Sequence, residues 1–211
     1  MSNKIQLKPG LSVDVIKTIS ALKKEPKWML EFRLNAYKVF KQKKNPKWGP
    51  NLSFLNFDDY IYYASSLGSE YVKTNWKDVP KKIKKIFEEL KVPENEAKYF
   101  SGSHDQYDSE TVYSRIKKEL EDKKVIFTNI ETAIREHPEL VKKYFGKLIP
   151  PTDNKYAALN SAVWSGGSFV YIPKNVKLDQ PLQAYFRINT KAVGQFERTL
   201  IIVDEGAYVH Y

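Results

Sequence analysis

The chain has 211 residues, 42% hydrophobic and 14% aromatic, so it is long enough and apolar enough to bury a core. It contains no cysteine and three widely separated histidines, which excludes a disulfide framework, a thiolate nucleophile and a local zinc motif within these residues. No apolar run approaches the roughly 20 residues that cross a bilayer, and residues 1–9 lack the pattern of a secretory signal. We therefore expect a cytoplasmic protein, or one of a plastid-type organelle if its gene is organelle-encoded.

The formal charge of +10 suggests a nucleic-acid-binding module as an alternative function. The excess lies in residues 1–150, which hold 29 of the 35 basic and 20 of the 25 acidic residues. In residues 81–87, four lysines flank Ile83, Ile86 and Phe87, as on the solvated face of an amphipathic helix. Arginine, which recognises bases and phosphates through two parallel hydrogen bonds, is scarce. The pattern favours a solvated helix face over a phosphate-binding one.

Residues 1–150 are predicted to be mainly helical. Helices are expected at 12–24 and 28–43, and Glu25–Pro26 separates them because proline disfavours helical geometry in the residue before it. The aromatic stretch at 51–71 favours an irregular packed segment over an aromatic binding surface. Periodicity and capping residues predict further helices at 78–91, 109–122, 129–135 and 138–145, and a short strand at 125–127.

The pattern changes after Pro150–Pro151. Short β-rich runs at 168–172, 182–188, 198–203 and 207–211 replace helical periodicity. No helix-sized segment lies between these runs, which excludes a doubly wound α/β sheet. A sandwich, a barrel and a parallel β-helix stay open, and the irregular corners favour the β-helix. The sequence therefore predicts an α+β fold, with a helical region at 1–150 and the incomplete beginning of an all-β region at 151–211.

Three short motifs could carry chemistry, and each has a simpler structural interpretation. Residues 165–168 (Ser-Gly-Gly-Ser) could cradle a phosphate, but no helix follows them, so a turn is favoured. Residues 103–105 (Ser-His-Asp) are adjacent in sequence, and adjacent residues do not make a catalytic triad. Asp204 and Glu205 could act as paired carboxylates, but a solvated turn is favoured.

Residues 153–174 closely resemble the SufB/SufD family of iron–sulfur cluster assembly proteins, and within it the SufB scaffold. The resemblance continues through residues 185–189 and 194–205. Upstream, four further blocks are similar to the same family: 28–34, 48–50, 106–110 and 135–142. The blocks occur in a consistent order over almost the whole chain.

This resemblance implies a helical amino-terminal region followed by the first coils of a right-handed parallel β-helix, truncated at Tyr211. It implies a scaffold without catalytic turnover of its own, on which nascent clusters are built with SufD-like and SufC-like subunits. Sulfur would come from a cysteine desulfurase system, and the ATPase activity belongs to the SufC-like partner. The family complex carries an iron–sulfur cluster and is associated with reduced flavin, whereas no cofactor is expected in these residues alone.

By the same resemblance, Arg187 and Asn189 match polar residues that line the β-helix interior and assist cluster assembly. They are two residues apart, so a strand would place both on one face, and the arginine could attract persulfide or other anions. An ordinary role in stabilising the coil stays open for both residues.

The sequence also departs from the family pattern. The chain ends before the family's cysteine, histidine and glutamate ligands and before its SufC-binding helices, and Thr128 stands where many relatives have a cysteine. We therefore assign no catalytic residue and no metal ligand within the chain, and expect that it does not hold a cluster by itself.

Overall fold

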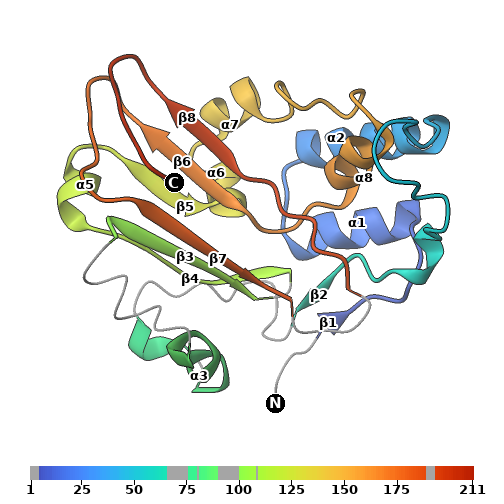
Figure 1. Ribbon diagram of the computed structural model, residues 1–211, viewed down its shortest axis with the longest axis horizontal. Helices are drawn as coiled ribbons and strands as arrows, with labels where there is room; N and C mark the ends of the chain where they lie inside the picture. The colour runs from blue at the N-terminus through green and yellow to red at the C-terminus, as the bar shows by residue number, and fades with distance from the viewer. Residues whose placement is uncertain (1–4, 66–75, 80, 90–99, 108, 189–192) are drawn as a thin grey trace.

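The computed structural model describes residues 5–65, 76–79, 81–89, 100–107, 109–188 and 193–211 (Figure 1). Helices and sheets both contribute, in agreement with the predicted α+β class. In chain order, the helices are α1 (Val13–Leu22), α2 (Lys27–Gln42), η1 (Phe57–Asp59), η2 (Trp76–Asp78), α3 (Lys81–Glu89), α5 (Lys118–Asp122), α6 (Ile130–Glu136), α7 (Pro138–Tyr144) and α8 (Lys155–Val163). The strands are β1 (Ile5–Gln6), β2 (Ala64–Ser65), β3 (Gly102–Tyr107), β4 (Glu110–Ile116), β5 (Ile126–Asn129), β6 (Ser168–Ile172), β7 (Leu182–Arg187) and β8 (Leu200–Val203).

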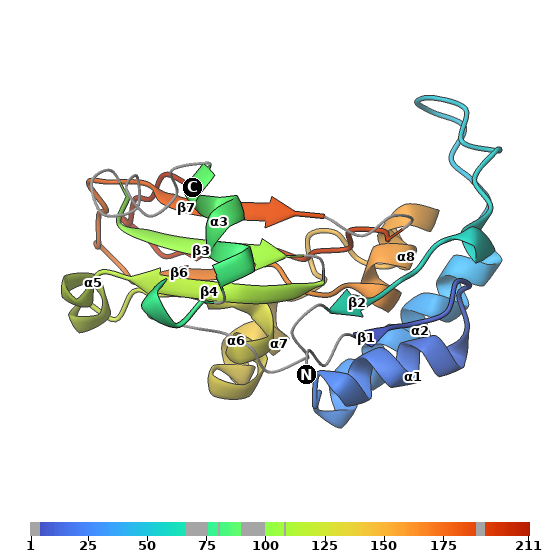
Figure 2. The same ribbon diagram turned by 90° about the horizontal axis from the view of Figure 1, so that it is seen from below.

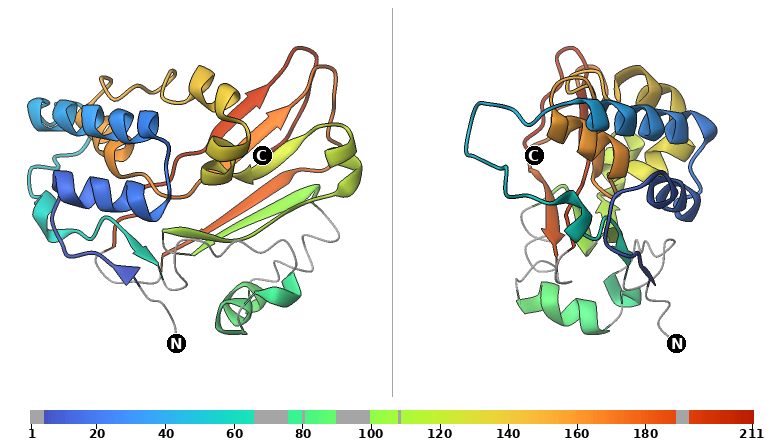
Figure 3. Two further views of the ribbon diagram at one scale, coloured as in Figure 1. Left: turned by 180° about the vertical axis from the view of Figure 1, so that it is seen from behind. Right: turned by 90° about the vertical axis from the view of Figure 1, so that its right-hand side faces the viewer.

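Helices α1, α2 and α8 pack together at one end of the molecule (Figures 1 and 3). Ser12 caps α1 by accepting the N–H of Val15 at 3.2 Å, as its position before an amphipathic segment predicts. Ile16 and Ile19 bury the inner face of α1 against Ala36 of α2. The predicted helices at 12–24 and 28–43 are thus confirmed to within about two residues at each end.

Helix α8 lies after residue 151, where the sequence predicts only β-structure. Asn154 caps it, since its Oδ1 accepts the N–H groups of Tyr156 and Ala157 at 2.8 and 3.0 Å. Six of its nine residues are buried, and the other three, Lys155, Tyr156 and Asn160, are half-buried. Since no residue of the helix is fully exposed, it lacks the amphipathic period by which helices are recognised in a sequence.

Two three-stranded sheets lie at the other end of the molecule. One has the order β4–β3–β7 and the other β5–β6–β8. In each sheet the first two strands are antiparallel and the last two are parallel. Strands from both sides of residue 150 therefore share each sheet, and the division into a region 1–150 and a region 151–211 stays a prediction.

The β5–β6–β8 sheet is covered on both faces (Figure 2). Phe169 and Ile202 pack on one face against α6 and α7. Val170 and Ile172 point to the other face, where a second apolar cluster lies between the two sheets and includes Leu182 of β7. The alternation of side chains along β6 thus builds two cores, one on each side of the sheet.

The predicted helix at 109–122 is wrong over most of its length. Its first part is strand β4, and only Lys118–Asp122 is helical. Residues 110–116 are rich in β-branched and aromatic side chains, and pairing with β3 outweighs the helical spacing of the apolar residues. The predicted strand at 207–211 is reduced to one isolated bridge, between Lys177 and Tyr208. Within the described ranges, no helix is long and apolar enough to cross a membrane.

A buried ion pair ties the helices together. Arg33 of α2 donates from Nε and Nη2 to the two carboxylate oxygens of Glu25, at 2.8 and 2.6 Å. Its Nη1 donates to the carbonyl of Ala162 in α8 at 3.2 Å, and its guanidinium lies 4.4 Å from the centre of the Trp164 ring. Both charged side chains are almost completely inaccessible to solvent. The pair therefore connects α2, the turn before it and α8.

The substitution Glu25→Gln should destabilise the protein by about 3–5 kcal/mol, because it leaves the Arg33 charge buried without its partner. Urea denaturation followed by circular dichroism measures this loss. The matched control is Glu31→Gln, which removes an exposed pair with Lys27 and should change the unfolding midpoint little. Equal effects of the two substitutions would contradict the assigned role of the buried pair.

Candidate functional site

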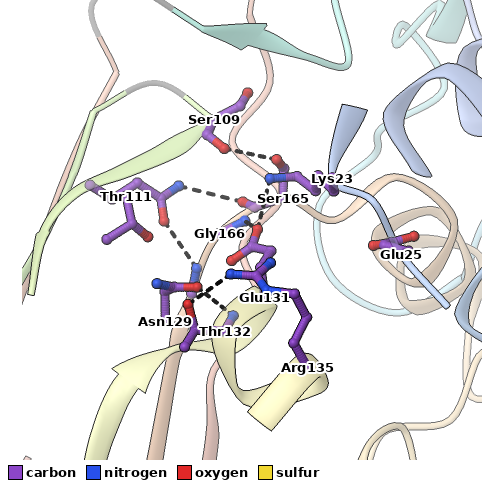
Figure 4. Close-up of polar contacts among 12 residues, drawn as sticks. Lys23, Glu25, Ser109, Thr111, Asn129, Glu131, Thr132, Arg135, Ser165 and Gly166 are labelled. Atoms are coloured by element: carbon purple, nitrogen blue, oxygen red, sulfur yellow. Dashed lines mark hydrogen bonds and ion pairs between the residues drawn. The ribbon is translucent and has the colours of Figure 1, made fainter. Parts of the chain in front are cut away.

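The turn at residues 165–168 lies where the helical end of the molecule meets the sheets (Figure 4). Gly166 and Gly167 have φ angles of +77° and +110°, which favour glycine. A Cβ on Gly166 would lie 2.1 Å from Oε1 of Gln106, and one on Gly167 would lie 2.4 Å from the carbonyl oxygen of Arg198. Close packing as well as backbone geometry therefore requires glycine at both positions.

The N–H groups of this turn all have acceptors inside the protein. Gly166 donates to Oε1 of Glu131 at 2.7 Å, and Gly167 donates to Oε1 of Gln106 at 3.0 Å. The N–H groups of Ser165 and Ser168 donate to the Phe196 carbonyl and the Thr199 hydroxyl, at 2.6 and 3.3 Å. No N–H group of the turn is left for a phosphate, which confirms the structural interpretation of the Ser-Gly-Gly-Ser motif.

An ion pair with little solvent access lies beside the turn. The Nζ of Lys23, just after α1, is 2.7 Å from Oε1 of Glu131 in α6, and the two side chains are 1% and 11% exposed. Burial alone raises the pKa of the Glu131 carboxyl. The charge and hydrogen bond of Lys23, together with the N–H of Gly166, outweigh burial and hold that pKa below its ordinary value.

Strand β3 carries a run of buried polar side chains. Gln106 donates from Nε2 to the carbonyl of Ser165 at 3.4 Å, and Ser165 donates from Oγ to the carbonyl of Ser109 at 2.8 Å. We call Lys23, Gln106, Glu131, Ser165 and Gly166 the polar junction, because they join α1, β3, α6 and the turn before β6. Of these residues, only Ser165 and Gly166 belong to a motif that the sequence indicates, the Ser-Gly-Gly-Ser turn, because the others meet them through tertiary contacts.

His104 is fully buried two residues before Gln106. Its Nε2 lies 3.4 Å from Oγ1 of Thr111, and its ring lies between those of Phe127 and Phe186, with centroids 6.1 and 6.3 Å away. Burial lowers the pKa of His104 to about 4, although the charge of Glu131 acts in the opposite direction. The imidazole is therefore neutral at pH 7, as expected for a histidine of the core.

The structure describes one of the two predicted assembly residues. Arg187 is the last residue of β7 and is exposed. Phe186 contacts His104 on the face toward β5, so the alternation of a strand places Arg187 on the opposite face. Asn189 lies outside the described residues. The role of each in cluster assembly stays a prediction.

The remaining candidate motifs serve structure. Residues 103–105 lie on one strand, so the side chain of His104 points away from those of its two neighbours. Asp204 accepts the hydroxyl of Tyr171 at 2.7 Å, and Glu205 forms an exposed pair with Lys174 at 2.6 Å. In the part of the chain that the structure describes, no three His, Asp or Glu side chains group as metal ligands would.

Acid should destabilise the protein through Glu131. Its pKa is lower in the folded state, so its contribution is complete above the unfolded value of about 4.3 and is lost as the pH falls through the folded value. Glu131→Gln should lower the stability at pH 7 and flatten its dependence on pH between about 5 and 3. Urea midpoints measured at several pH values test this, with Glu205→Gln in the exposed pair as control. A pH profile unchanged by Glu131→Gln would contradict the assignment.

The comparisons with known proteins agree on one family. A family model described as the SufBD protein N-terminal region matches residues 17–184, which include the whole polar junction. The chain is 56% identical over 202 residues to an "Iron-sulfur cluster assembly SufBD family protein" of Staphylococcus haemolyticus (strain JCSC1435). It is 55% identical over 202 residues to proteins of the same description from Staphylococcus aureus strains USA300 and NCTC 8325 / PS 47.

Each of these matches covers 96% of the chain and 43% of the relative, so the chain spans less than half the length of these relatives. The family model alone covers well over half of the chain. The resemblance found in the sequence is therefore confirmed, and the chain belongs to the SufBD family.

Proposed function

We propose that this chain is the amino-terminal part of an iron–sulfur cluster assembly scaffold of the SufB type. The observation that carries the proposal is the family match over residues 17–184, supported by relatives described as iron–sulfur cluster assembly proteins. The choice of SufB over SufD rests on the sequence resemblance of residues 153–174. In this proposal the chain has no catalytic turnover of its own and acts with SufC-like and SufD-like subunits and a cysteine desulfurase.

The architecture proposed for the longer protein is a right-handed parallel β-helix that begins in residues 151–211, after a mainly helical region at 1–150. Support comes from the offset between paired residues. Phe169 pairs with Leu200, and Lys177 pairs with Tyr208, so the offset is 31 residues in the strand and in the corner after it. One offset at both places is what successive coils of a solenoid, stacked in parallel, would give. A structure of a full-length relative with no further parallel coil on β8 would contradict this architecture.

The proposed cargo is iron and sulfide, assembled with ligands that lie outside this chain. The chain has no cysteine, and thiolates are the usual ligands of iron–sulfur clusters. Arg187 and Asn189 are proposed to attract sulfur-bearing anions on their way to those ligands. An exposed guanidinium at the end of a parallel strand is suited to this role, because it offers several donors and a permanent charge. The reduced flavin of the family complex stays a prediction.

Anaerobic reconstitution with ferrous iron and sulfide tests the function. The chain alone should acquire no stable cluster. A chimera in which residues 1–211 replace the matching part of the Staphylococcus haemolyticus relative should acquire one, seen by its visible absorption and circular dichroism. In the chimera, Arg187→Ala should slow cluster formation about tenfold, as expected when a residue that assists the metal ligands is lost.

The matched control in the chimera is Lys174→Ala, which removes a charge from an exposed ion pair. It should leave the rate unchanged, and far-ultraviolet circular dichroism should show that both variants fold. A stoichiometric cluster on the chain alone would contradict the proposed location of the ligands. Equal rates for the two variants would remove the role proposed for Arg187.

The alternative is a basic nucleic-acid-binding module that uses the lysine-rich helices and exposed aromatic residues, and it rests on these and on the charge of +10. The family match and the named relatives lend it no support. It predicts an affinity for duplex DNA that falls steeply as the salt concentration rises. The slope of the logarithm of affinity against the logarithm of salt concentration should correspond to the release of several counterions. An affinity that does not depend on salt, or no binding, would remove this alternative.

A further inference from the structure

A hollow of about 510 Å³ opens beside α7, α8 and β8, and no residue of the polar junction lines it. Its lining includes Phe145, Ile149 and Asn160 on one side and Glu197, Arg198 and Ile201 on the other. This volume is within the range of small-molecule sites, roughly 300–1,000 Å³. The hollow lies wholly within described residues, and neither the sequence motifs nor the proposed function makes use of it.

Arg198 is the charged group that distinguishes this hollow. It is half-buried, and its Nη1 donates to Oγ of Ser161 at 2.6 Å and to Oδ1 of Asn160 at 3.2 Å. Its Nη2 donates to the carbonyl of Ile149 at 2.7 Å. All three acceptors are neutral, and a guanidinium has five N–H donors. Within the described residues, no carboxylate forms an ion pair with Arg198.

Two aromatic rings connect the guanidinium of Arg198 to that of Arg33. Arg33 stacks on Trp164 at 4.4 Å, the Trp164 ring lies 5.3 Å from that of Phe145, and Arg198 lies 4.9 Å from the centre of Phe145. The carboxylate of Glu25 neutralises the charge of Arg33 and not that of Arg198. Burial, together with the charge of Arg33, lowers the pKa of Arg198 to about 10. Arg198 is still protonated at pH 7, and a negative charge in the hollow would stabilise it.

The other residues of the lining restrict which kind of anion the hollow can bind. Leu148 and Ile149 are 95% and 61% exposed, so they offer apolar surface at the hollow. Glu197 also lines the hollow, and burial raises the pKa of its carboxyl. Glu197 repels any anion in the hollow, and it repels a doubly charged phosphate about twice as strongly as a single carboxylate at the same distance. A single carboxylate can contact Arg198 and lay an apolar body along Leu148, Ile149 and Leu200.

We propose that this hollow binds a small apolar molecule that carries one carboxylate. Arg198 orients the carboxylate through hydrogen bonds in which donor and acceptor are both charged, whereas its present acceptors are neutral oxygens. Leu148, Ile149 and Leu200 cover the apolar part. The proposal does not depend on cluster assembly, so it can fail or succeed separately from the proposed function.

The test uses 4-phenylbutyrate as a probe, with 4-phenylbutanol and 4-phenylbutylamine as matched neutral and cationic analogues. Titrations followed by ¹H–¹⁵N spectra of the whole chain should show shifts of the Arg198 side chain and of the backbone around 148–149 and 197–201. The carboxylate should bind at least tenfold more tightly than either analogue, as a hydrogen bond to a charged group predicts. Inorganic phosphate should cause no comparable shifts.

Two substitutions separate binding from folding. Leu148→Glu places a like charge at an exposed position of the hollow and should weaken 4-phenylbutyrate binding about tenfold without affecting the core. Phe54→Glu, at an exposed residue that does not line the hollow, is the control and should change nothing. Arg198→Gln should abolish the preference for the carboxylate over the alcohol. Equal binding of all three probes, equal binding of phosphate, or no shift at these residues would overturn the proposal.

Discussion

The ion pair between Lys23 and Glu131 joins the end of helix α1 to helix α6, which packs on the β5–β6–β8 sheet. Oε1 of Glu131 also accepts the N–H of Gly166. This carboxylate therefore binds both the ammonium of Lys23, just after α1, and a backbone donor of the turn before β6. A buried charge is costly unless all its partners are in place. The position of α1, the start of α6 and the conformation of the turn are therefore mutually dependent. Gln106 extends this dependence to β3 through its bond to Gly167.

Local signals in the sequence predict some elements well and others not at all. Helices α1 and α2 have amphipathic periods and clear boundaries, and β6 and β7 are short β-rich runs. Helix α8 is not predicted because most of its residues are buried and none is exposed, so it has no amphipathic period. Strand β4 is not predicted because its pairing with β3 overrides the helical spacing of its apolar residues. The polar junction could not be predicted, since Lys23 and Glu131 are 108 residues apart and only the fold brings them together. The blocks that resemble the SufB/SufD family are a different kind of signal, and they identify the family without any physical account of the junction.

The parallel pairing of β6 with β8 connects the fold to the proposed function. The offset of 31 residues is the same in the strand pair and at the bridge after it. In the proposed β-helix, such a repeat would place equivalent side chains of successive coils above one another. Strand β7 pairs in parallel with β3, and Arg187 stands at its end. In a longer protein, a stack of such strands would give a row of positions along which charged intermediates could pass. The hollow around Arg198 lies on the helical side of the β5–β6–β8 sheet, so it offers a separate surface for a different ligand.

A double-mutant cycle between Lys23 and Glu131 tests most directly whether the junction holds helices and sheets together. The variants are Lys23→Met, Glu131→Gln and the combination of both, with the free energy of unfolding measured in urea at pH 7. The account predicts that the double substitution costs less than the sum of the single ones by about 1.5–3 kcal/mol, because each single variant removes one half of the Lys23–Glu131 pair while the other half stays buried. Additive effects, within about 0.5 kcal/mol, would contradict it.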